Sequence, residues 1–361
     1  MRVLFDGDIF SSQRHGGVSR YFTMLARGIN QLSDADCTVL APLHVNRHLS
    51  DERDLRVIGG RIDVASGALL PRYCTRLLSP CIGPWLSADV VHETYFCRWP
   101  YFASSAPRVV TVHDMVSELI PFSQMATVVK RAAVARADKI ICISENTRRD
   151  LCRLFNVEEE RTEVVHHGFV DFGSIVTRDE HPAVPRPYFL FVGRRSGYKN
   201  WAAMIKAFAS SRLIKQGYSI VCFGDHFAAS ESAFLEEQGI PSGAVVSVGG
   251  SDERLADLYR SAVALVYPSR YEGFGFPLLE AMSAGCIVAC SDTSSLPEVA
   301  GNAAAFFDPN DVDDIRFVME AVAESDVLRS ELRACGYERC RAFSWDKCVS
   351  ETVAAYRSVV R

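Results

Sequence analysis

The chain has 361 residues, about twice the roughly 150 residues of a usual domain, so it is expected to form two domains or one large one. Its residues are 48% hydrophobic and 23% charged, which allows sizeable cores and excludes a disordered chain. The net charge of −5 excludes a global attraction to nucleic acid. Residues 1–170 carry 20 Lys and Arg against 19 Asp and Glu, whereas residues 171–361 carry 19 against 25, so the second half is the more acidic.

Short apolar runs alternate with longer amphipathic stretches along the first half, as in βα units built around a parallel sheet. Helical patterns occupy residues 19–32 and 127–136. The residues expected to form strands are 2–5, 37–40, 90–92, 109–112, 140–143 and 162–165. Residues 1–172 are therefore expected to form one Rossmann-like domain.

A polar segment with three prolines, residues 173–188, has no periodicity and is predicted to be a linker. A second set of apolar runs predicts a second Rossmann-like domain over residues 189–343. Its expected strands are residues 189–192, 219–223, 245–248, 263–267, 287–289 and 304–306. The last segment, about 344–361, has a helical apolar stripe and is expected to be a closing helix. The whole pattern predicts an α/β fold of two Rossmann-like domains that face each other across a ligand cleft.

The twelve cysteines are irregularly spaced and contain no C-x-x-C pair, which favours reduced structural thiols over a metal or redox site. The N-terminal apolar stretch is too short for a signal peptide, and no run approaches the roughly 18 apolar residues of a membrane span. A soluble, cytoplasmic protein is expected.

The segment 267–285 carries the most chemical information. An expected strand runs into a glycine-bearing loop, and Pro277 stands where a helical turn begins. Backbone N–H groups at such a helix start attract an anion such as a diphosphate. Because Pro277 has no N–H, the expected donors are the amides of Gly275, Phe276 and Leu278.

Two acids flank this loop, Glu272 before it and Glu280 in the first helical turn. Acceptors on both sides of an anion site suit a nucleotide sugar, whose hydroxyls lie on both sides of its diphosphate. The chain has enough glutamates for about one pair at this spacing by chance, so the context must support the assignment. A solvated loop carboxylate and a first-turn acid favoured by the helix dipole are the alternative.

A second motif follows the strand expected at 189–192. Gly193 ends that strand, Arg194 and Lys199 lie in the next loop, and Asn200 is expected to cap the following helix. Cations at this edge can hold a diphosphate and offset the charge that it gains on leaving. In isolation, surface cations paired with local acids are the commoner explanation.

The first domain contributes three candidates. Gly16 and Gly17 precede the first helix, where the backbone can approach an anionic ligand closely. His113 ends an apolar strand and is placed to bond a sugar hydroxyl, although a histidine there is more often structural. Ser144 ends another strand and either lines the cleft or caps the next helix.

Over nearly its full length the chain resembles the family 4 retaining glycosyltransferases of the GT-B fold. The motifs that carry the resemblance are Gly16-Gly17, His113-Asp114, Ser144-Glu145, His166-His167-Gly168, Gly193-Arg194 with Lys199-Asn200, Ser251-Asp252-Glu253 with Tyr259, Glu272-Gly273-Phe274-Gly275 with Glu280, and Ser295-Leu296-Pro297-Glu298. The resemblance implies a donor bound mainly by the second domain, an acceptor bound mainly by the first, and a last helix that crosses back to the first domain.

The family pattern assigns roles to matching residues. Glu280 would hold the ribose hydroxyls, Arg194 and Lys199 the diphosphate, and Glu272 the transferred sugar, which His113 would also face. The catalytic residues implied are Glu272, Arg194, Lys199 and His113. The donor-binding residues implied are Gly16, Gly17, Ser144, Gly193, Arg194, Lys199, Gly249, Glu272, Phe274, Gly275, Phe276, Leu278 and Glu280. The family needs neither metal nor cofactor, and a donor phosphate oxygen takes the acceptor proton.

Other functions remain to be weighed against this one. Asp6-Gly7-Asp8 matches a D-x-D metal motif of the other large glycosyltransferase fold, but it lies unusually early in the chain. A dinucleotide-dependent oxidoreductase would need G-x-G-x-x-G after the first strand, which is missing. A sugar-nucleotide epimerase of the GT-B fold and a non-catalytic nucleotide-sugar-binding subunit are the remaining alternatives.

The acceptor side is predicted within residues 66–86, which mix leucines and Trp85 with Arg72 and Arg76; Arg20 is a further candidate. Basic and apolar groups together suit an anionic lipid or a polyprenyl-diphosphate glycan, so association with the inner membrane face is a hypothesis. A partly buried amphipathic helix explains the segment equally well. The N-terminal motifs are similar to those of bacterial transferases for O-antigen, capsule or exopolysaccharide, which favours GDP-mannose over a UDP-sugar. The loop after Val248, with Gly249, is expected to contact the base.

Overall fold

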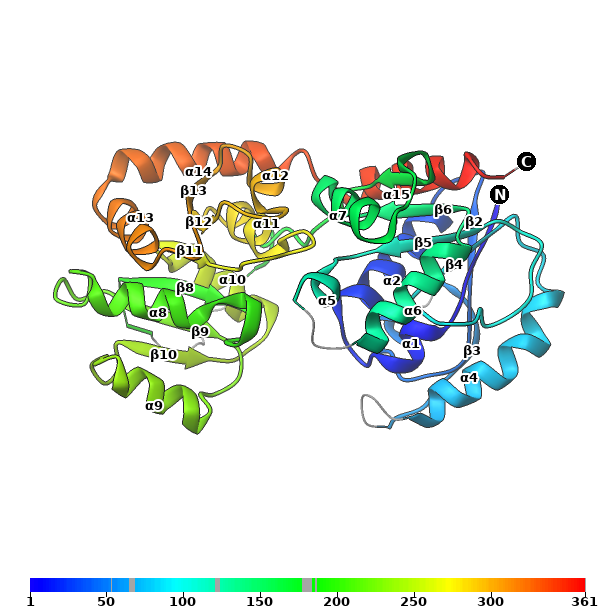
Figure 1. The fold of residues 1–361 in the computed structure, drawn as a ribbon, viewed down its shortest axis with the longest axis horizontal. Coiled ribbons are helices and arrows are strands. Elements are labelled where there is room, and N and C mark those ends of the chain that lie inside the picture. Colours follow the sequence, from blue (N-terminus) through cyan, green and yellow to red (C-terminus); the bar gives the residue numbers. More distant parts are fainter. Residues whose placement is uncertain (53, 65–68, 121–123, 177–183, 186, 361) are drawn as a thin grey trace. The chain divides into compact units, whose positions relative to one another are not determined.

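The computed structural model describes residues 1–361 except 53, 65–68, 121–123, 177–183, 186 and 361. The chain divides into two compact units, Met1–Gly168 together with Ser344–Arg361, and Phe169–Phe343. Each unit has helices packed around its own parallel sheet (Figure 1). Much of the predicted linker, residues 177–183 and 186, lies outside the described residues.

In the described part of the chain, the first sheet has seven parallel strands in the order β3-β2-β1-β4-β5-β6-β7. The strands are β1 (Arg2–Phe5), β2 (Asp36–His44), β3 (Arg56–Arg61), β4 (Val90–Glu93), β5 (Arg108–Val112), β6 (Lys139–Cys142) and β7 (Thr162–Val164). The sequence pattern did not predict β3, because this edge strand is largely exposed and contains two glycines instead of an apolar run.

The helices of the first unit are α1 (Asp8–Ser12), α2 (Gly17–Asn30), α3 (Arg47–Asp51), α4 (Leu69–Ile82), α5 (Val116–Leu119), α6 (Gln124–Arg136), α7 (Glu145–Phe155) and α15 (Trp345–Arg357), with short 3₁₀ turns η1 (Gly83–Trp85) and η2 (Glu159–Arg161). The last helix, α15, packs against α2 in the first unit's core, where Val349, Val353 and Tyr356 are buried. A Cβ added to Gly28 of α2 would lie 2.4 Å from a methyl group of Val349, so the close approach of these helices requires glycine.

The second sheet has six parallel strands among the described residues, in the order β10-β9-β8-β11-β12-β13. They are β8 (Tyr188–Val192), β9 (Ser219–Phe223), β10 (Val245–Val248), β11 (Ala264–Tyr267), β12 (Val288–Ser291) and β13 (Ala304–Phe307). The helices are α8 (Trp201–Ser210), α9 (Ala229–Glu237), α10 (Asp252–Ser261), α11 (Phe276–Ser283), α12 (Leu296–Ala300), α13 (Val312–Glu324) and α14 (Asp326–Cys340), with the 3₁₀ turn η3 (Gly197–Lys199).

Strand order reverses in each sheet next to its first strand. β1 lies between β2 and β4, and β8 lies between β9 and β11. In open parallel sheets, ligands bind beyond the carboxyl ends of the strands at such a reversal. The loops that follow β1, β8 and β11 are therefore the places where functional residues are expected to gather.

The first segment of the first unit ends at Gly168, four residues before the expected boundary at residue 172. The reason is that Phe172 binds residues of the second unit. Its amide donates to Ser283 Oγ at 3.0 Å, and its carbonyl accepts from Arg260 at 2.9 Å. Its ring also meets the Tyr259 ring edge-on, with centroids 5.4 Å apart.

Candidate donor site

Lys199 and Glu272 meet at the carboxyl edge of the second sheet. Lys199 ends η3 after β8, and Glu272 lies in the loop between β11 and α11. Lys199 Nζ donates to Glu272 Oε1 at 2.7 Å and to the hydroxyl of Tyr267 at 2.8 Å. The two charged side chains are only 17% and 11% exposed. The ammonium of such a pair can bind an anionic group, and the carboxylate can accept from a hydroxyl.

The loop that carries Glu272 is held by two serines that precede α12. The Glu272 amide donates to Ser294 Oγ at 3.0 Å. Ser295 Oγ lies 2.9 Å from the carbonyl oxygens of Glu272 and Phe274 and can donate to either. At Gly275 the φ angle is +110°, which only glycine adopts readily. The loop shape is therefore fixed by side-chain hydroxyls and by one glycine.

The start of α11 agrees in part with the sequence prediction. Pro277 lies in the first turn and Gly275 is the residue before the helix, as expected. The amide of Leu278 is not an available donor, however, because it already bonds to the Gly275 carbonyl at 3.0 Å. Leu278 is also fully buried, so the structure does not support its expected role in donor binding.

Glu280 is half-buried on α11, one turn further along the helix. The hydroxyl of Tyr259, which is fully buried on α10, donates to Glu280 Oε2 at 3.2 Å. Burial and the nearby carboxylate raise the pKa of Tyr259 well above its usual value, so this phenol keeps its proton. Glu280 is thus held by a permanent donor.

A cavity of about 680 Å³ lies at the carboxyl ends of β8 and β9. Gly193 and Arg194 line it, and Arg194 is exposed with no hydrogen bond or ion pair to another described residue. The neighbouring Arg195 is held instead, because it donates to Glu231 Oε1 at 2.9 Å and to the His226 carbonyl at 2.9 Å. Of these two adjacent cations, Arg194 is the one placed to reach a ligand in the cavity.

Two other expectations about this unit need adjustment. Asn200 precedes α8, but its side chain does not cap the helix; it donates to the Pro309 carbonyl at 2.7 Å. Its φ of +58° shows why, since a residue in the left-handed region does not place its side chain over the first turn. Gly249 is exposed after β10 and is not among the residues that line the 680 Å³ cavity.

In the first unit, His113 follows β5 and packs against aromatic rings. The ring of Tyr21 lies 5.2 Å away edge-on, and that of His167 is stacked at 5.5 Å. Burial lowers the pKa of His113 to about 4, so the imidazole is neutral at pH 7. Its buried Nε2 has no hydrogen-bond partner among the described residues. A neutral imidazole with an unused nitrogen can bond a sugar hydroxyl.

The two glycines before α2 differ in what surrounds them. A Cβ on Gly16 would lie 2.2 Å from Gln13 Oε1, which accepts from the Ser19 amide at 3.4 Å. A Cβ on Gly17 would meet nothing within 4 Å. The Gln13 side chain therefore already occupies part of the helix start that was expected to bind an anion. Arg20 is half-buried on α2.

Ser144 acts as a helix cap. Its Oγ accepts from the Thr147 amide at 3.1 Å at the start of α7, and the side chain is completely buried. Of the two roles proposed for Ser144 from the sequence, the structure supports capping. Direct donor contact is not supported.

Of the two arginines on α4 that were expected on the acceptor side, Arg72 pairs with a buried carboxylate and Arg76 stacks on a neighbouring ring. Arg72 Nε lies 3.3 Å from Asp8 Oδ1, and the Tyr101 hydroxyl donates to the same oxygen at 2.7 Å. The guanidinium of Arg76 lies over the Tyr101 ring at 5.5 Å. Asp8 is fully buried, so Arg72 is the cationic partner of a carboxylate of the fold, while 45% of the Arg72 side chain stays exposed.

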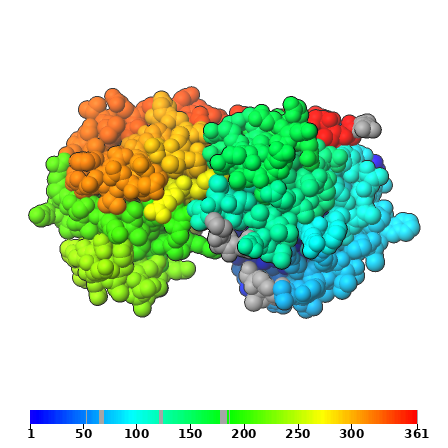
Figure 2. Space-filling view, viewed as in Figure 1, coloured from blue at the N-terminus to red at the C-terminus, as the bar shows by residue number. Residues whose placement is uncertain are grey.

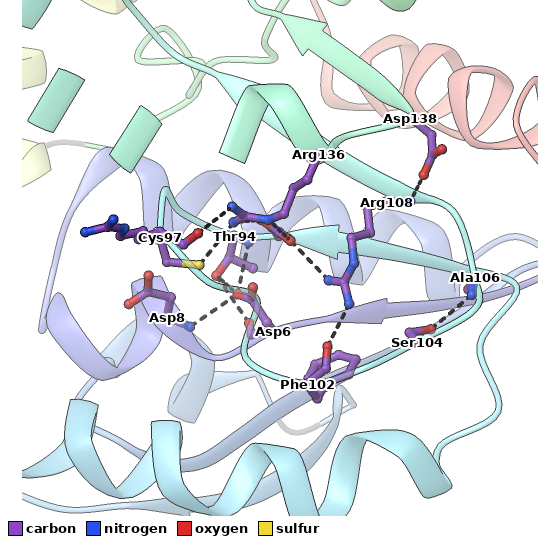
Figure 3. A network of polar contacts seen from close by, with 12 residues as sticks. Asp6, Asp8, Thr94, Cys97, Phe102, Ser104, Ala106, Arg108, Arg136 and Asp138 are labelled. Carbon is purple, nitrogen blue, oxygen red and sulfur yellow. Dashed lines mark hydrogen bonds and ion pairs between the residues drawn. The ribbon is translucent and has the colours of Figure 1, made fainter. Parts of the chain in front are cut away.

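Asp6 and Asp8, the D-x-D motif, belong to this polar network (Figure 3). Asp6 Oδ1 accepts from the Thr94 hydroxyl at 2.6 Å and from the Thr94 amide at 3.0 Å. Burial, together with the nearby acids Glu93 and Asp8, raises the pKa of Asp6 to about 7. Arg136 and Arg108 bind Glu93 in turn. Among the described residues no group of three or more His, Cys, Asp or Glu could hold a metal ion.

Sequence reasoning gave no role to Tyr267, Ser294 or Tyr259. The available signals were weak. Tyr267 is the last residue of an apolar strand, where a functional phenol is hard to distinguish from a ring of the core. Tyr259 belongs to a motif that carries the family resemblance but points to no chemistry by itself.

The chain was compared with known proteins. Profiles of two families, Glycosyltransferase Family 4 and Glycosyl transferases group 1, match residues 15–171 and 176–339. O-antigen chain mannosyltransferase B of Escherichia coli is 30% identical over 303 residues, which are 78% of each chain. The structure of Anabaena Alr3699/HepE in complex with UDP and glucose has a TM-score of 0.74 at 16% identity, covering 99% of both chains. WaaG, a glycosyltransferase involved in lipopolysaccharide biosynthesis, has a TM-score of 0.70 at 17% identity, covering 99% of both chains.

The two profiles together cover all the strands of both sheets except β1, and the E. coli relative aligns along most of the chain. The fold of two parallel sheets is GT-B, and the protein belongs to glycosyltransferase family 4.

Proposed function

We propose that this glycosyltransferase moves mannose from GDP-mannose to a lipid-linked surface glycan such as O-antigen. The observation that carries the proposal is the Lys199–Glu272 pair, which places a cation and a hydroxyl acceptor side by side at the carboxyl edge of the second sheet. The name of the E. coli relative, O-antigen chain mannosyltransferase B, supports the choice of sugar and glycan.

In this proposal the residues of the second unit divide the donor among them. Arg194 and Lys199 bind the diphosphate, since both are cations in the segment between β8 and α8. Glu272 accepts from hydroxyls of the sugar, and Glu280 accepts from the ribose. The Lys199 ammonium stabilises the charge that develops on the diphosphate as the sugar leaves.

The transfer is proposed to retain the anomeric configuration. The bond between C1 of the sugar and the diphosphate oxygen breaks, and the acceptor oxygen bonds to C1 on the same face. The acceptor proton passes to the departing diphosphate oxygen, so no protein base is required. The family resemblance assigns His113 a hydrogen bond to a sugar hydroxyl, and the neutral imidazole has a buried nitrogen without a partner among the described residues. Neither metal nor cofactor takes part in the proposed reaction.

Helix α4 supports an acceptor at a lipid surface. Its four most exposed large apolar side chains are Leu69, Leu70, Tyr73 and Leu77, which are 63%, 60%, 59% and 73% exposed. The light-blue segment that contains α4 lies at the surface of its unit in Figure 2. Such side chains can enter the interface of a bilayer. Among the described residues no helix is long and apolar enough to cross a membrane.

A thermal-shift screen tests the donor. Purified protein is mixed with GDP, UDP or ADP, and then with GDP-mannose, each with and without EDTA. A ligand that binds only the folded state raises the melting temperature. GDP and GDP-mannose are expected to give the largest rise, which EDTA should leave unchanged. A larger rise with UDP, or a rise that EDTA abolishes, would overturn the donor or the metal-independent reaction.

Product analysis tests the reaction. GDP-mannose is α-linked, so retention predicts an α-mannosyl product on the acceptor glycan, which the C1–H1 coupling in NMR distinguishes from a β-linked one. A β-linked product would reject retention. Conversion of the donor without any acceptor would favour the epimerase, and nucleotide-sugar binding without turnover would favour a non-catalytic binding subunit.

A further inference from the structure

Two buried tyrosine hydroxyls contact the groups that the proposed function assigns to the donor. Tyr267 ends β11 and lies under the Lys199–Glu272 pair, and Tyr259 lies on α10 beside Glu280. Neither ring is more than 2% exposed. A buried phenol usually needs one hydrogen-bond partner for its hydroxyl. For each of these two phenols, that partner is a charged side chain of the site.

Tyr267 fixes the ammonium of Lys199. Lys199 Nζ lies 2.8 Å from the phenol oxygen and 2.7 Å from Glu272 Oε1, so it is held from two sides. Burial and Glu272 raise the pKa of Tyr267 well above its usual value, so the phenol stays protonated. When Glu272 turns to the hydroxyls of a bound sugar, the phenol still holds the ammonium in place.

Tyr259 fixes the carboxylate of Glu280. Its hydroxyl donates to Glu280 Oε2 at 3.2 Å from the neighbouring helix α10. A ribose presents two adjacent hydroxyls, and a carboxylate receives both well only in one orientation. The hydroxyl of Tyr259 therefore sets which way the carboxylate faces before a nucleotide arrives.

We propose that Tyr259 and Tyr267 are positioning residues with separate effects: Tyr259 acts through Glu280 on nucleotide affinity, and Tyr267 acts through Lys199 and Glu272 on the rate of transfer. The inference rests on the proposed function, since it assumes that Glu280 binds the ribose and Lys199 the diphosphate. The physical reason for the separation is that ribose contacts are the same in ground and transition states, whereas charge grows on the diphosphate only during transfer.

Tyrosine-to-phenylalanine variants test this, because each removes one oxygen and keeps the ring. Tyr188→Phe is the matched control: Tyr188 is fully buried in the same sheet as Tyr267, and its hydroxyl donates to a backbone carbonyl, that of Leu258, at 2.8 Å. The dissociation constant is measured by calorimetry for whichever of GDP and UDP stabilises the wild type. Steady-state kcat and donor KM are then measured with the matching nucleotide sugar.

Tyr259→Phe is expected to raise the nucleotide dissociation constant and KM about fivefold to tenfold while kcat stays within about twofold. Tyr267→Phe is expected to lower kcat at least about tenfold while the dissociation constant stays within about threefold. Tyr188→Phe should change neither by more than about twofold. Should Tyr259→Phe unfold at the assay temperature, Glu280→Gln tests the same hydrogen bond by changing its acceptor, and it should raise the nucleotide dissociation constant by the same factor.

The outcomes separate this inference from the proposed function. A wild type that binds no nucleoside diphosphate and transfers no sugar refutes both. A wild type that does both, with Tyr259→Phe and Tyr267→Phe equal to Tyr188→Phe, refutes the positioning roles alone. If Tyr259→Phe and Tyr267→Phe both change kcat, or both change the dissociation constant, by the same factor, the positioning roles are also refuted, because a merely structural effect would be common to both variants.

Discussion

Lys199 Nζ lies 2.7 Å from Glu272 Oε1, although 73 residues separate the two in the sequence. The contact follows from strand order. β8 and β11 are neighbours in the sheet, with Ala264 paired to Phe189, so the loops that leave their carboxyl ends meet. The cation and the carboxylate that we propose to bind different parts of the donor are thus held together by the fold itself.

Lys199→Ala and Glu272→Ala are each expected to lower turnover at least about 100-fold, because each removes charge stabilisation at the departing diphosphate or sugar. The two effects should not multiply in the double variant, since the residues act as one unit. Turnover of GDP-mannose is the measurement. Lys206→Ala, an exposed lysine on α8, is the control and should match the wild type. Wild-type rates in both variants would reject the assignment.

Ser295→Ala tests whether the Glu272 loop must be held. Ser295 Oγ is buried 2.9 Å from the carbonyl oxygens of Glu272 and Phe274, so its loss should cost about 1–2 kcal/mol of stability and lower kcat. Ser291→Ala is the matched control, because Ser291 Oγ is buried with no partner among the described residues. That change should be neutral or stabilising. Urea denaturation and kcat check both, and a Ser295→Ala enzyme with wild-type kcat would contradict the prediction.

Much of this site could be predicted from local sequence. β9 and β10 occupy the expected residues 219–223 and 245–248, and Pro277 opens α11 as its backbone requires. Side-chain partners could not be predicted. Nothing near Arg72 in the sequence indicates that it neutralises buried Asp8, and nothing near Tyr267 indicates that its hydroxyl holds Lys199. Such pairs depend on the packing of elements distant in the chain, whereas periodicity and caps depend on neighbours.

The pH dependence of stability should respond in opposite ways to Asp6→Asn and His113→Gln. The pKa of Asp6 is raised to about 7, so between about pH 4 and 7 the folded state keeps a proton that the unfolded state releases. Stability from this group is therefore lost as pH rises. The pKa of His113 is lowered to about 4, so between about pH 4 and 6.5 the unfolded state binds a proton that the folded state does not bind. Stability from this group is therefore lost as pH falls.

Urea denaturation at pH 5.0 and 7.5 measures both variants against the wild type. The measured quantity is the free energy of unfolding at pH 7.5 minus that at pH 5.0. Relative to the wild type, Asp6→Asn should raise this difference by about 2–3 kcal/mol, and His113→Gln should lower it by about 2 kcal/mol. Shifts in the same direction would show that one of the two groups has an ordinary pKa.

Arg72→Ala is expected to destabilise the fold, because Asp8 is fully buried and Arg72 is its cationic partner. The free energy of unfolding should fall by about 1–3 kcal/mol. Adding Asp8→Asn should restore part of it, since the neutral amide still accepts from Tyr101 but no longer needs a cation. Thermal denaturation of the three variants checks this. If the double variant is less stable than Arg72→Ala alone, the pair does not act through charge.

Membrane binding, if α4 provides it, should depend on apolar side chains rather than on Arg72. Leu70→Ser with Leu77→Ser removes two of the most exposed leucines of α4 and should lower binding to phosphatidylglycerol vesicles at least about fivefold in co-sedimentation, because the lost area no longer enters the bilayer interface. Phe317→Ser, on α13 of the second unit and 58% exposed, is the matched control and should bind as the wild type does. Equal vesicle binding by the wild type, the double leucine variant and Phe317→Ser would show that α4 does not contact the membrane. Binding lost equally in both variants would mean that exposed apolar side chains act nonspecifically.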